Sequence, residues 1–315
     1  MSIELTVSPA PRRTAPDVSI VIVCWNNKRY LEPCLQSLYE AGLQHSFEVT
    51  VIDNGSTDGT QAMVRDNFPQ VHVIQNDHNV GLSRASNQGI QSANGKHVLL
   101  LNDDTLVNRT SLDGMFEFME AHPDAGAVGG RLLNPDGTFQ SGYASFYSLI
   151  QEFLIATRLG LLIASTYPLH GGDNRVREVD WLSSACLLVR RAALDQVGLL
   201  REDYFIYGDE VDLQYRLKRA GWKVYYLPEV TTIHFGGRTL NRWRRRKMVY
   251  RGKLLFYRKN YGAISTGALR VTLGVLSMAK LAVWGGIFLL PPWHARAHEE
   301  VASNLDILRL CWKPE

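Results

Sequence analysis

Short apolar runs alternate with amphipathic segments through the first third of the chain. The runs at Val18–Cys24, 47–52, 71–74 and 98–101 are dominated by β-branched and aliphatic residues, which is typical of buried parallel strands. Between them, segments 30–39, 61–67 and 79–93 repeat apolar residues at helical spacing or open with helix-start signals. The alternation predicts an α/β protein with a doubly wound parallel sheet that binds its ligands at the carboxyl ends of the strands.

The second half of the pattern is less regular. A helix is expected over 110–121 and another from Asp209 to Ala220, where Gly221 ends it. Further strands are expected over 127–133, 181–189, 222–227 and 231–234. The stretch 146–164 is apolar with few charges, and it is either a buried helix or part of an apolar acceptor surface; we favour the surface.

The buried run at 98–101 ends abruptly in Asn102, Asp103 and Asp104. Adjacent carboxylates repel unless a cation or a proton lies between them. A divalent metal held by one or two carboxylates and by substrate phosphates would remove this repulsion. The alternative is a polar turn that caps the next helix, and the motif alone does not separate the two.

Composition narrows the class of protein. With 315 residues, 45% of them hydrophobic and 21% charged, the chain is expected to be globular. The net charge of +3 is small, so any basic surface must be local. The four cysteines (Cys24, Cys34, Cys186 and Cys311) show no paired spacing and are expected to be reduced in a cytoplasmic protein. Residues 1–16 are expected to form a flexible tail, since they lack the apolar core of a signal peptide.

The loop after the second expected strand carries the sequence Asp53-Asn-Gly-Ser-Thr-Asp58. Neither the glycine pattern of a dinucleotide site nor a phosphate-binding P-loop follows the first strand, and the spacing does not fit an EF-hand. Asp53 is placed to accept hydrogen bonds from a base or ribose. The alternative is a glycine-rich turn closed by an Asx hydrogen bond.

Two further acids open the helix at Asp209. Asp209 and Glu210 lie in its first turn, where the helix dipole favours negative charge. This stabilising role would explain the presence of both acids without a catalytic function. A single histidine at a strand end, such as His234, is more often structural than catalytic.

Taken together, these motifs resemble family 2 inverting glycosyltransferases with the GT-A (Rossmann-like nucleotide-diphospho-sugar transferase) fold. The resemblance rests on Val18 to Asn26, the Asp53 loop, Asn79-Val-Gly-Leu82, the acidic strand end and Phe205-Ile-Tyr-Gly-Asp-Glu-Val-Asp-Leu213 followed by a histidine. It covers residues 18 to 240 in the family's order and looks most like bacterial rhamnosyltransferases of cell-surface polysaccharides or lipid-linked glycans.

The resemblance implies roles for individual residues. The nucleotide-sugar site would be formed by Cys24, Asn26, Asp53, Asn79, Gly81, Leu82, Asn102 and Asp103. Asp104 matches the metal ligand of the family's DXD-type motif, and His234 a histidine that completes the metal shell in some members. Glu210 matches the general base, while Trp181 and Asp209 would border the acceptor. Asn102 stands where many members have an acid, and Asp209-Glu210 reverses the commoner Glu-Asp order, which leaves the base between two neighbours.

This resemblance implies a metal-dependent inverting transfer, with Mg²⁺ or Mn²⁺ neutralising the diphosphate leaving group. The donor would be dTDP-rhamnose, or else a UDP- or GDP-sugar, and the acceptor a saccharide or polyprenyl-linked glycan. Hydrolysis by two paired acids and a non-catalytic nucleotide-sugar binding protein are the alternatives.

Beyond an expected catalytic domain at 17–240, the segment 241–315 is basic and then apolar. Nine cations lie between Arg242 and Lys259 with aromatic residues among them, and 263–293 is apolar except for Arg270 and Lys280. We expect an amphipathic segment that lies on the anionic inner face of the cell membrane, and no nucleic-acid partner. The alternative is a helical pair that caps the catalytic domain or forms a homodimer.

Overall fold

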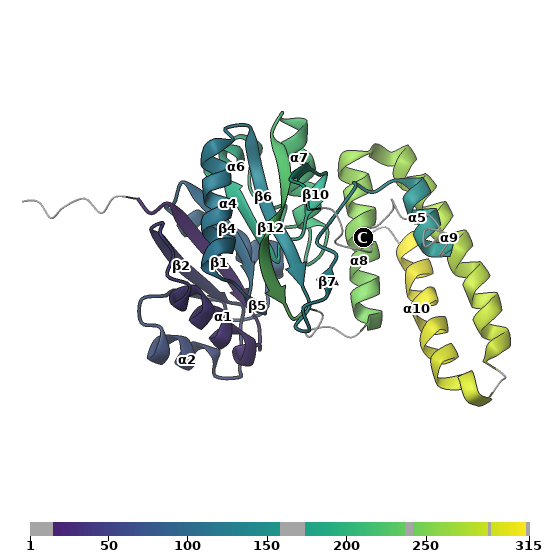
Figure 1. Cartoon of the computed structure of the whole chain (residues 1–315). Helices are drawn as coiled ribbons and strands as arrows, with labels where there is room; N and C mark the ends of the chain where they lie inside the picture. Colours follow the sequence, from purple (N-terminus) through teal and green to yellow (C-terminus); the bar gives the residue numbers. More distant parts are fainter. Residues whose placement is uncertain (1–14, 158–173, 237–241, 289–290, 313–315) are drawn as a thin grey trace, which may run out of the picture.

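The computed structural model describes residues 15–157, 174–236, 242–288 and 291–312. A ten-stranded mixed sheet forms the centre of this part of the chain (Figure 1). Its main path is β3 (His72–Gln75), β2 (Phe47–Asp53), β1 (Val18–Cys24), β4 (His97–Asn102), β11 (Cys186–Arg190), β6 (Ala125–Leu133), β12 (Lys223–His234) and β5 (Thr105–Leu106). The short strands β7 (Phe139–Gln140) and β9 (Arg177–Glu178) pair with β6 and β12.

The predicted parallel arrangement is confirmed for the first four strands. β3, β2, β1 and β4 are parallel neighbours, and their register pairs Cys24 with Asp53 and Val23 with Asn102. The prediction of a parallel sheet is wrong for β11, which is antiparallel to both β4 and β6, whereas β6 and β12 are parallel to each other. The chain enters β11 from the edge where the parallel strands end, so no crossover helix is needed and the pairing is antiparallel.

Two strand predictions change for local reasons. The expected strand 181–189 is divided, because β10 (Trp181–Leu182) pairs with β8 (Tyr143–Ala144) in a separate two-stranded sheet. There the Gln214 side chain bonds both backbone groups of Leu182, at 2.8 and 2.7 Å. Conversely, the two strands expected after residue 222 are one strand, β12, with a register shift between Leu227 and Thr231. Pro228 lies in this shift, where a residue without an N–H group is tolerated.

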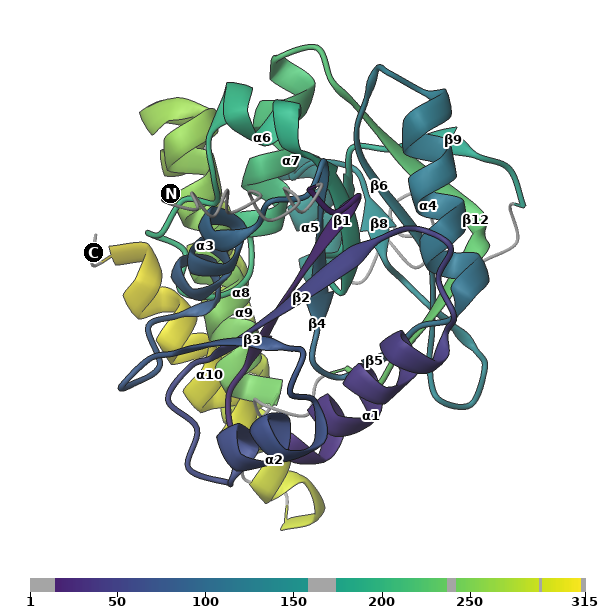
Figure 2. The same cartoon turned by 90° about the vertical axis from the view of Figure 1, so that its left-hand side faces the viewer.

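Helices cover both faces of the sheet (Figures 1 and 2). α1 (Lys28–Glu40), α2 (Thr60–Asn67) and α4 (Arg109–Ala121) contribute to one apolar core, and α3 (Leu82–Ser92), α6 (Arg191–Val197) and α7 (Asp209–Arg219) to the other. Strand residues alternate between the two cores, so Leu99 and Leu101 join the first and Val98 and Leu100 the second. The continuous apolar runs of the sequence therefore reflect burial on both faces.

The C-terminal segment packs beside the sheet as α8 (Arg242–Asn260), α9 (Gly262–Ile287), the short 3-10 helix Pro291–Trp293 and α10 (His294–Trp312) (Figure 1). Buried aromatic residues of α8, among them Phe256 and Tyr257, share a third apolar core with Val211 of α7. Lys253, one of the nine cations of the basic segment, is buried and paired with Glu152 of α5 (Leu149–Thr157) at 2.6 Å. α8 therefore fits the alternative of a helical cap on the catalytic domain.

The apolar stretch after α8 forms a single long helix. In the described part of the chain, α9 is the one helix with the length and composition to cross a membrane, with a mean hydropathy of 1.3 and 28% of its most apolar window buried. Val271, Val275 and Met278 are exposed on it. Of the stretch 146–164, residues 149–157 form α5, which buries Glu152 and exposes Ile150 and Phe153, and residues 158–164 lie outside the described residues.

The contact between α8 and the loop before α7 has no room for a side chain. A Cβ atom on Gly252 would lie 2.2 Å from the backbone oxygen of Tyr207. We expect Gly252→Ala to lower the free energy of unfolding by about 1–3 kcal/mol, because the backbone of α8 or of the loop must move. Gly267→Ala in α9 is the matched control, since nothing lies within 4 Å of its Cβ position and alanine favours a helix. Equal effects in chemical denaturation would contradict the close approach.

Candidate active site

Several predicted site residues lie at the carboxyl ends of neighbouring strands. β1 ends at Cys24, β2 at Asp53 and β4 at Asn102, and the register places these ends side by side. β12 ends at His234, which pairs with Thr105 of β5, so the chain following Asp104 lies next to the histidine. The sheet thus brings together, at one edge, residues that lie far apart in the sequence, from Cys24 to His234.

His234 lies between Asp104 and Gln140. Its Nε2 atom is 3.2 Å from Asp104 Oδ1 and 3.3 Å from Asn102 Nδ2, while its Nδ1 atom is 2.6 Å from Gln140 Oε1. The Gln140 amide nitrogen donates to His234 O and Asn134 Oδ1, which directs its Oε1 toward the ring. Nδ1 therefore carries a proton and donates a hydrogen bond to Gln140 Oε1. The other ring nitrogen, Nε2, faces the carboxylate of Asp104.

In a neutral ring, Nε2 and the Asp104 oxygen are both acceptors, so a cation or a proton must lie between them. Imidazole and carboxylate ligands with a hydrogen bond behind the histidine are a common donor set for divalent metals. Among the described residues, no three His, Cys, Asp or Glu side chains cluster as a complete metal site. The pair is thus suited to a metal whose remaining ligands come from substrate and water.

Asp103 points to a different neighbour from Asp104. Its Oδ1 accepts from Asn27 Nδ2 at 2.9 Å. Burial, followed by the charge of Asp104, raises the pKa of Asp103 to about 7. Asn27, which the sequence analysis did not single out, connects the loop after β1 to the acidic strand end.

The loop after β2 is braced by buried amides. Asp53 is fully buried and accepts from the backbone N–H of Ser56 and from Gln61 Nε2. Asn54, another residue that the sequence analysis missed, donates to Asn79 Oδ1 at 3.0 Å and accepts from Val80 N at 3.1 Å. Cys24 is buried below this loop, and burial raises the pKa of its thiol. Asn54 thus joins two of the loops assigned to the nucleotide-sugar site.

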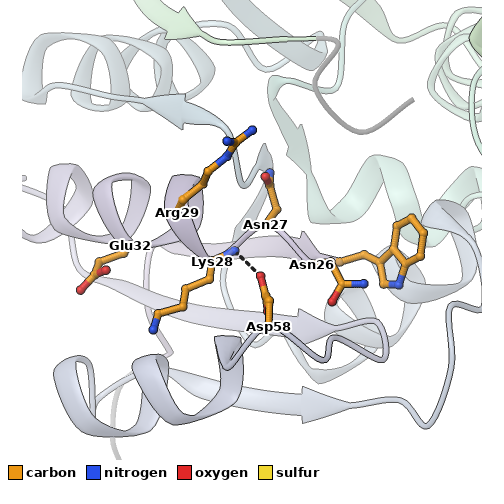
Figure 3. A pocket seen from close by; sticks show the side chains of 7 residues that line it. Asn26, Asn27, Lys28, Arg29, Glu32 and Asp58 are labelled. Carbon is orange, nitrogen blue, oxygen red and sulfur yellow. Dashed lines mark hydrogen bonds between the residues drawn. The ribbon is translucent and has the colours of Figure 1, made fainter. Parts of the chain in front are cut away.

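A cavity of about 600 Å³ opens beside the loop after β1 (Figure 3). It is lined by Trp25, Asn26, Asn27, Lys28, Arg29, Glu32 and Asp58. Asn26 has a positive φ of 50° and its Oδ1 accepts from Thr57 N at 2.7 Å, while Asp58 Oδ2 accepts from Lys28 N at 2.9 Å. These bonds hold the ends of β1 and β2 together at the mouth of the cavity.

The loop before α7 contacts the loop at Gly81. Leu82 N donates to Phe205 O at 2.7 Å, and Ser83 Oγ donates to Tyr204 O at 2.6 Å. Gly81 has a φ of 93°, and a Cβ there would lie 2.9 Å from the Phe205 ring. The loop assigned to the donor and the loop that precedes the two acids Asp209 and Glu210 are therefore joined directly.

Asp209 and Glu210 have different surroundings. Asp209 is 2% exposed, lines a small internal cavity with Leu82, and its Oδ1 has no hydrogen-bond partner among the described residues. Glu210 is half-buried and accepts from Gly208 N at 3.1 Å. Burial, and next the charge of Asp209, raises the pKa of Glu210 to about 8, while burial also raises that of Asp209. Of the two neighbours, Glu210 is the more exposed to solvent.

Trp181 lies apart from the strand ends. It is half-buried beside the third apolar core, and its Nε1 donates to Ser145 O at 3.0 Å. Its predicted contact with an acceptor remains a prediction.

The raised pKa of Glu210 implies a pH-dependent stability. Between its ordinary value of 4.5 and about 8, the folded protein holds a proton on Glu210 that the unfolded chain releases. The free energy of unfolding should therefore fall as the pH rises through this window. We expect Glu210→Gln to flatten that slope in urea denaturation, whereas Glu117→Gln, an exposed carboxylate on α4, should not. Parallel slopes in all three proteins would contradict the raised pKa.

Comparisons with known proteins identify the family of the chain. The sequence model of the family described as glycosyl transferase family 2 matches residues 19–198. An N-acetylglucosaminyl-diphospho-decaprenol L-rhamnosyltransferase of Mycobacterium tuberculosis is 32% identical over 231 residues, which cover 68% of this chain and 75% of that protein. The hexosyltransferase Agl10 of Haloferax volcanii, which acts in low-salt glycan biosynthesis, is 25% identical, with 69% and 67% covered.

Solved structures share the fold at low sequence identity. The mannosyltransferase PcManGT from Pyrobaculum calidifontis, in complex with GDP-Man and Mn²⁺, has a TM-score of 0.58 and 16% identity, covering 98% of this chain and 91% of its own. GalNAc-T7 with UDP, GalNAc and Mn²⁺ has a TM-score of 0.55 and 14% identity, covering 78% and 51%. Together with the sequence matches, they establish the expected GT-A fold and the enzyme class: the chain belongs to glycosyl transferase family 2 and is a glycosyltransferase that resembles rhamnosyltransferases.

Proposed function

We propose that this glycosyltransferase moves L-rhamnose from dTDP-rhamnose to a polyprenyl-linked glycan in cell-envelope polysaccharide synthesis, with inversion at the sugar carbon. The observation that carries the proposal is the half-buried Glu210, with its pKa raised to about 8, in the first turn of α7, directly after a loop that is bonded to Leu82 beside Asn79 and Gly81. The sugar and the acceptor rest on the name of the M. tuberculosis relative. The nucleotide is inferred, and a UDP- or GDP-sugar is the alternative donor, since the structural neighbours bind UDP or GDP-Man.

The reaction needs one base and one stabilised leaving group. Glu210 takes the proton of the acceptor hydroxyl, whose oxygen bonds to the anomeric carbon of the donor. The bond from that carbon to the phosphate breaks, and the nucleoside diphosphate leaves with the electron pair. A raised pKa makes Glu210 a stronger proton acceptor once it is ionised, and a single carboxylate is sufficient for direct displacement.

Asp104 and His234 are proposed to hold a Mg²⁺ or Mn²⁺ ion. Such an ion, when bound, neutralises the charge that grows on the diphosphate. Gln140 keeps the proton on the far ring nitrogen, so that Nε2 is free to coordinate. Asp103, with its pKa raised to about 7, is proposed to face the ribose or the same ion.

We also propose that the enzyme is cytoplasmic and peripheral on the inner face of the cell membrane. Support comes from α9, whose exposed Val271, Val275 and Met278 lie on a helix with only two charged residues, Arg270 and Lys280. Burial of this face in lipid would contribute free energy that salt does not screen, while nearby cations favour an anionic surface.

Substitution of each acid tests which of the two neighbours, Asp209 or Glu210, is the base. Glu210→Gln preserves shape and removes proton acceptance, so kcat should fall by about 10²–10⁴ with donor affinity unchanged. Asp209→Asn should have the smaller effect on kcat, because its side chain is buried away from substrate. Initial rates of transfer to an added acceptor and calorimetric donor binding measure both. The reverse order of effects would assign the base to Asp209.

The metal assignment can be tested without turnover. Asp104→Ala should abolish Mn²⁺-dependent binding of dTDP, and Gln140→Leu should weaken Mn²⁺ affinity by about 10–100-fold through the orientation of His234. Gln36→Leu, which removes an exposed amide on α1, serves as the control. Calorimetric titration of Mn²⁺ in the presence of dTDP gives the affinities. Unchanged Mn²⁺-linked binding in Asp104→Ala would exclude this metal site.

The membrane proposal is tested by substitution, since truncation at Arg242 would remove α8 from the core around Val211. The full chain should sediment with anionic liposomes, and less with neutral ones or in high salt. Val271→Asp with Val275→Asp should reduce sedimentation, whereas Val176→Asp, at an exposed valine before β9, should not. If the full chain ignores anionic vesicles, α9 is a packing or dimerisation element.

A further inference from the structure

A second large cavity, of about 940 Å³, lies among the C-terminal helices, away from the strand ends. Its walls come from α5, α8, α9 and α10, which lie side by side in Figure 1. The loop before α7, which we call the base loop, does not line it. We call it the helical pocket.

The polar lining of the helical pocket is mostly cationic. Arg242, Arg246, Lys280 and Arg296 line it, against one carboxylate, Glu300, among the described lining residues. Arg246 Nη1 is 3.2 Å from Glu300 Oε2, so this carboxylate offsets one of the four charges. A pocket with such an excess of cations is suited to a polyanion, and arginine side chains favour phosphate in particular.

Most of the remaining lining is apolar, and it extends to the outer surface of the helices. Trp284 and Trp293 flank Arg296, whose Cζ atom lies 5.6 and 5.9 Å from the two ring centroids. Val283 both lines the pocket and is 60% exposed, so the apolar wall continues onto the outer surface of α9. A ligand with an anionic head and a long apolar chain matches both parts of this lining.

α8 connects the pocket to the active site. Arg242, Arg246 and Tyr250 are spaced four residues apart and line the pocket, while Gly252 contacts the backbone of Tyr207 in the base loop. An α-helix with its side chains is about 10–12 Å across, which is therefore the scale of the separation between pocket and base loop. Arg242 also follows His234 by eight residues, which limits their separation to about 30 Å.

We propose that the helical pocket binds the diphosphate of an isoprenoid-linked glycan acceptor, with the isoprenoid chain along α9 and the sugar directed toward Glu210. This inference rests on the proposed function, since it supplies the binding site for the acceptor of that reaction. The diphosphate provides negative charge that complements the cationic part of the lining, and the chain matches the apolar wall that leads to the exposed face of α9.

Farnesyl diphosphate is a soluble probe of this pocket, with inorganic pyrophosphate and farnesol as its two halves. The full-length protein should bind farnesyl diphosphate more tightly than either half. Lys280→Gln with Arg296→Gln should weaken that binding by about tenfold or more, because bonds to charged groups are lost. Arg309→Gln is the matched control on α10, since its side chain is 73% exposed and does not line the pocket. Thermal unfolding of each variant, and of Lys280→Gln alone, verifies the fold.

The outcomes separate this inference from the proposed function. Equal affinities of the double variant and Arg309→Gln for farnesyl diphosphate would overturn the pocket assignment. Pyrophosphate binding as tight as that of farnesyl diphosphate would reveal an inorganic phosphate site, and farnesol binding as tight would reveal a general apolar site; both contradict the proposal. Binding of dTDP with Mn²⁺ should be the same in all variants. Its absence from the unsubstituted protein would instead contradict the proposed donor.

Discussion

The buried carboxylate of Asp212 joins the parts of the chain that hold Glu210, the proposed base, in place. It is fully buried and accepts from Arg201 at 2.7 Å, Arg216 at 2.9 Å and Asn260 of α8 at 2.8 Å. Arg216 also donates to three backbone oxygens, those of Val197, Gly198 and Leu199, at the end of α6. A buried charge is tolerated when it is paired and hydrogen-bonded in this way, and the loss of one partner costs about 3–5 kcal/mol. One side chain thus ties together α6, the base loop, α7 and α8.

This arrangement explains how adjacent acids take different roles. Asp209, Glu210 and Asp212 all lie in the first turn of α7, where the helix dipole favours negative charge. Asp212 is neutralised by partners, Asp209 is buried beside a small cavity, and Glu210 remains accessible beside Gly208. The position of each carboxylate around the helix decides its surroundings, because residues one position apart point about 100° away from each other.

The C-terminal helices also contact the elements around Asp212. Gly252 permits α8 to approach the base loop, and Asn260 reaches Asp212 of α7, so α8 supports both the base loop and the helix that carries Glu210. Its far side lines the helical pocket. A segment whose basic composition indicates a membrane surface therefore also packs against the catalytic domain, with Lys253 paired to Glu152 inside the protein.

The sequence by itself determined the alternation of strands and helices, the parallel arrangement of the first four strands and the edge at which the polar residues gather. These follow from local periodicity and from the rule that parallel strands end on one side. Only the tertiary structure decided that β11 is antiparallel, that Gln140 and Asn54 brace the site, and that α8 is a packing helix. It also distinguished Glu210 from Asp209 by their burial. The sequence could not do so, because the two acids carry the same charge and are neighbours in the same helix turn. Such features depend on contacts between residues far apart in the chain, and those contacts exist only after the chain has folded.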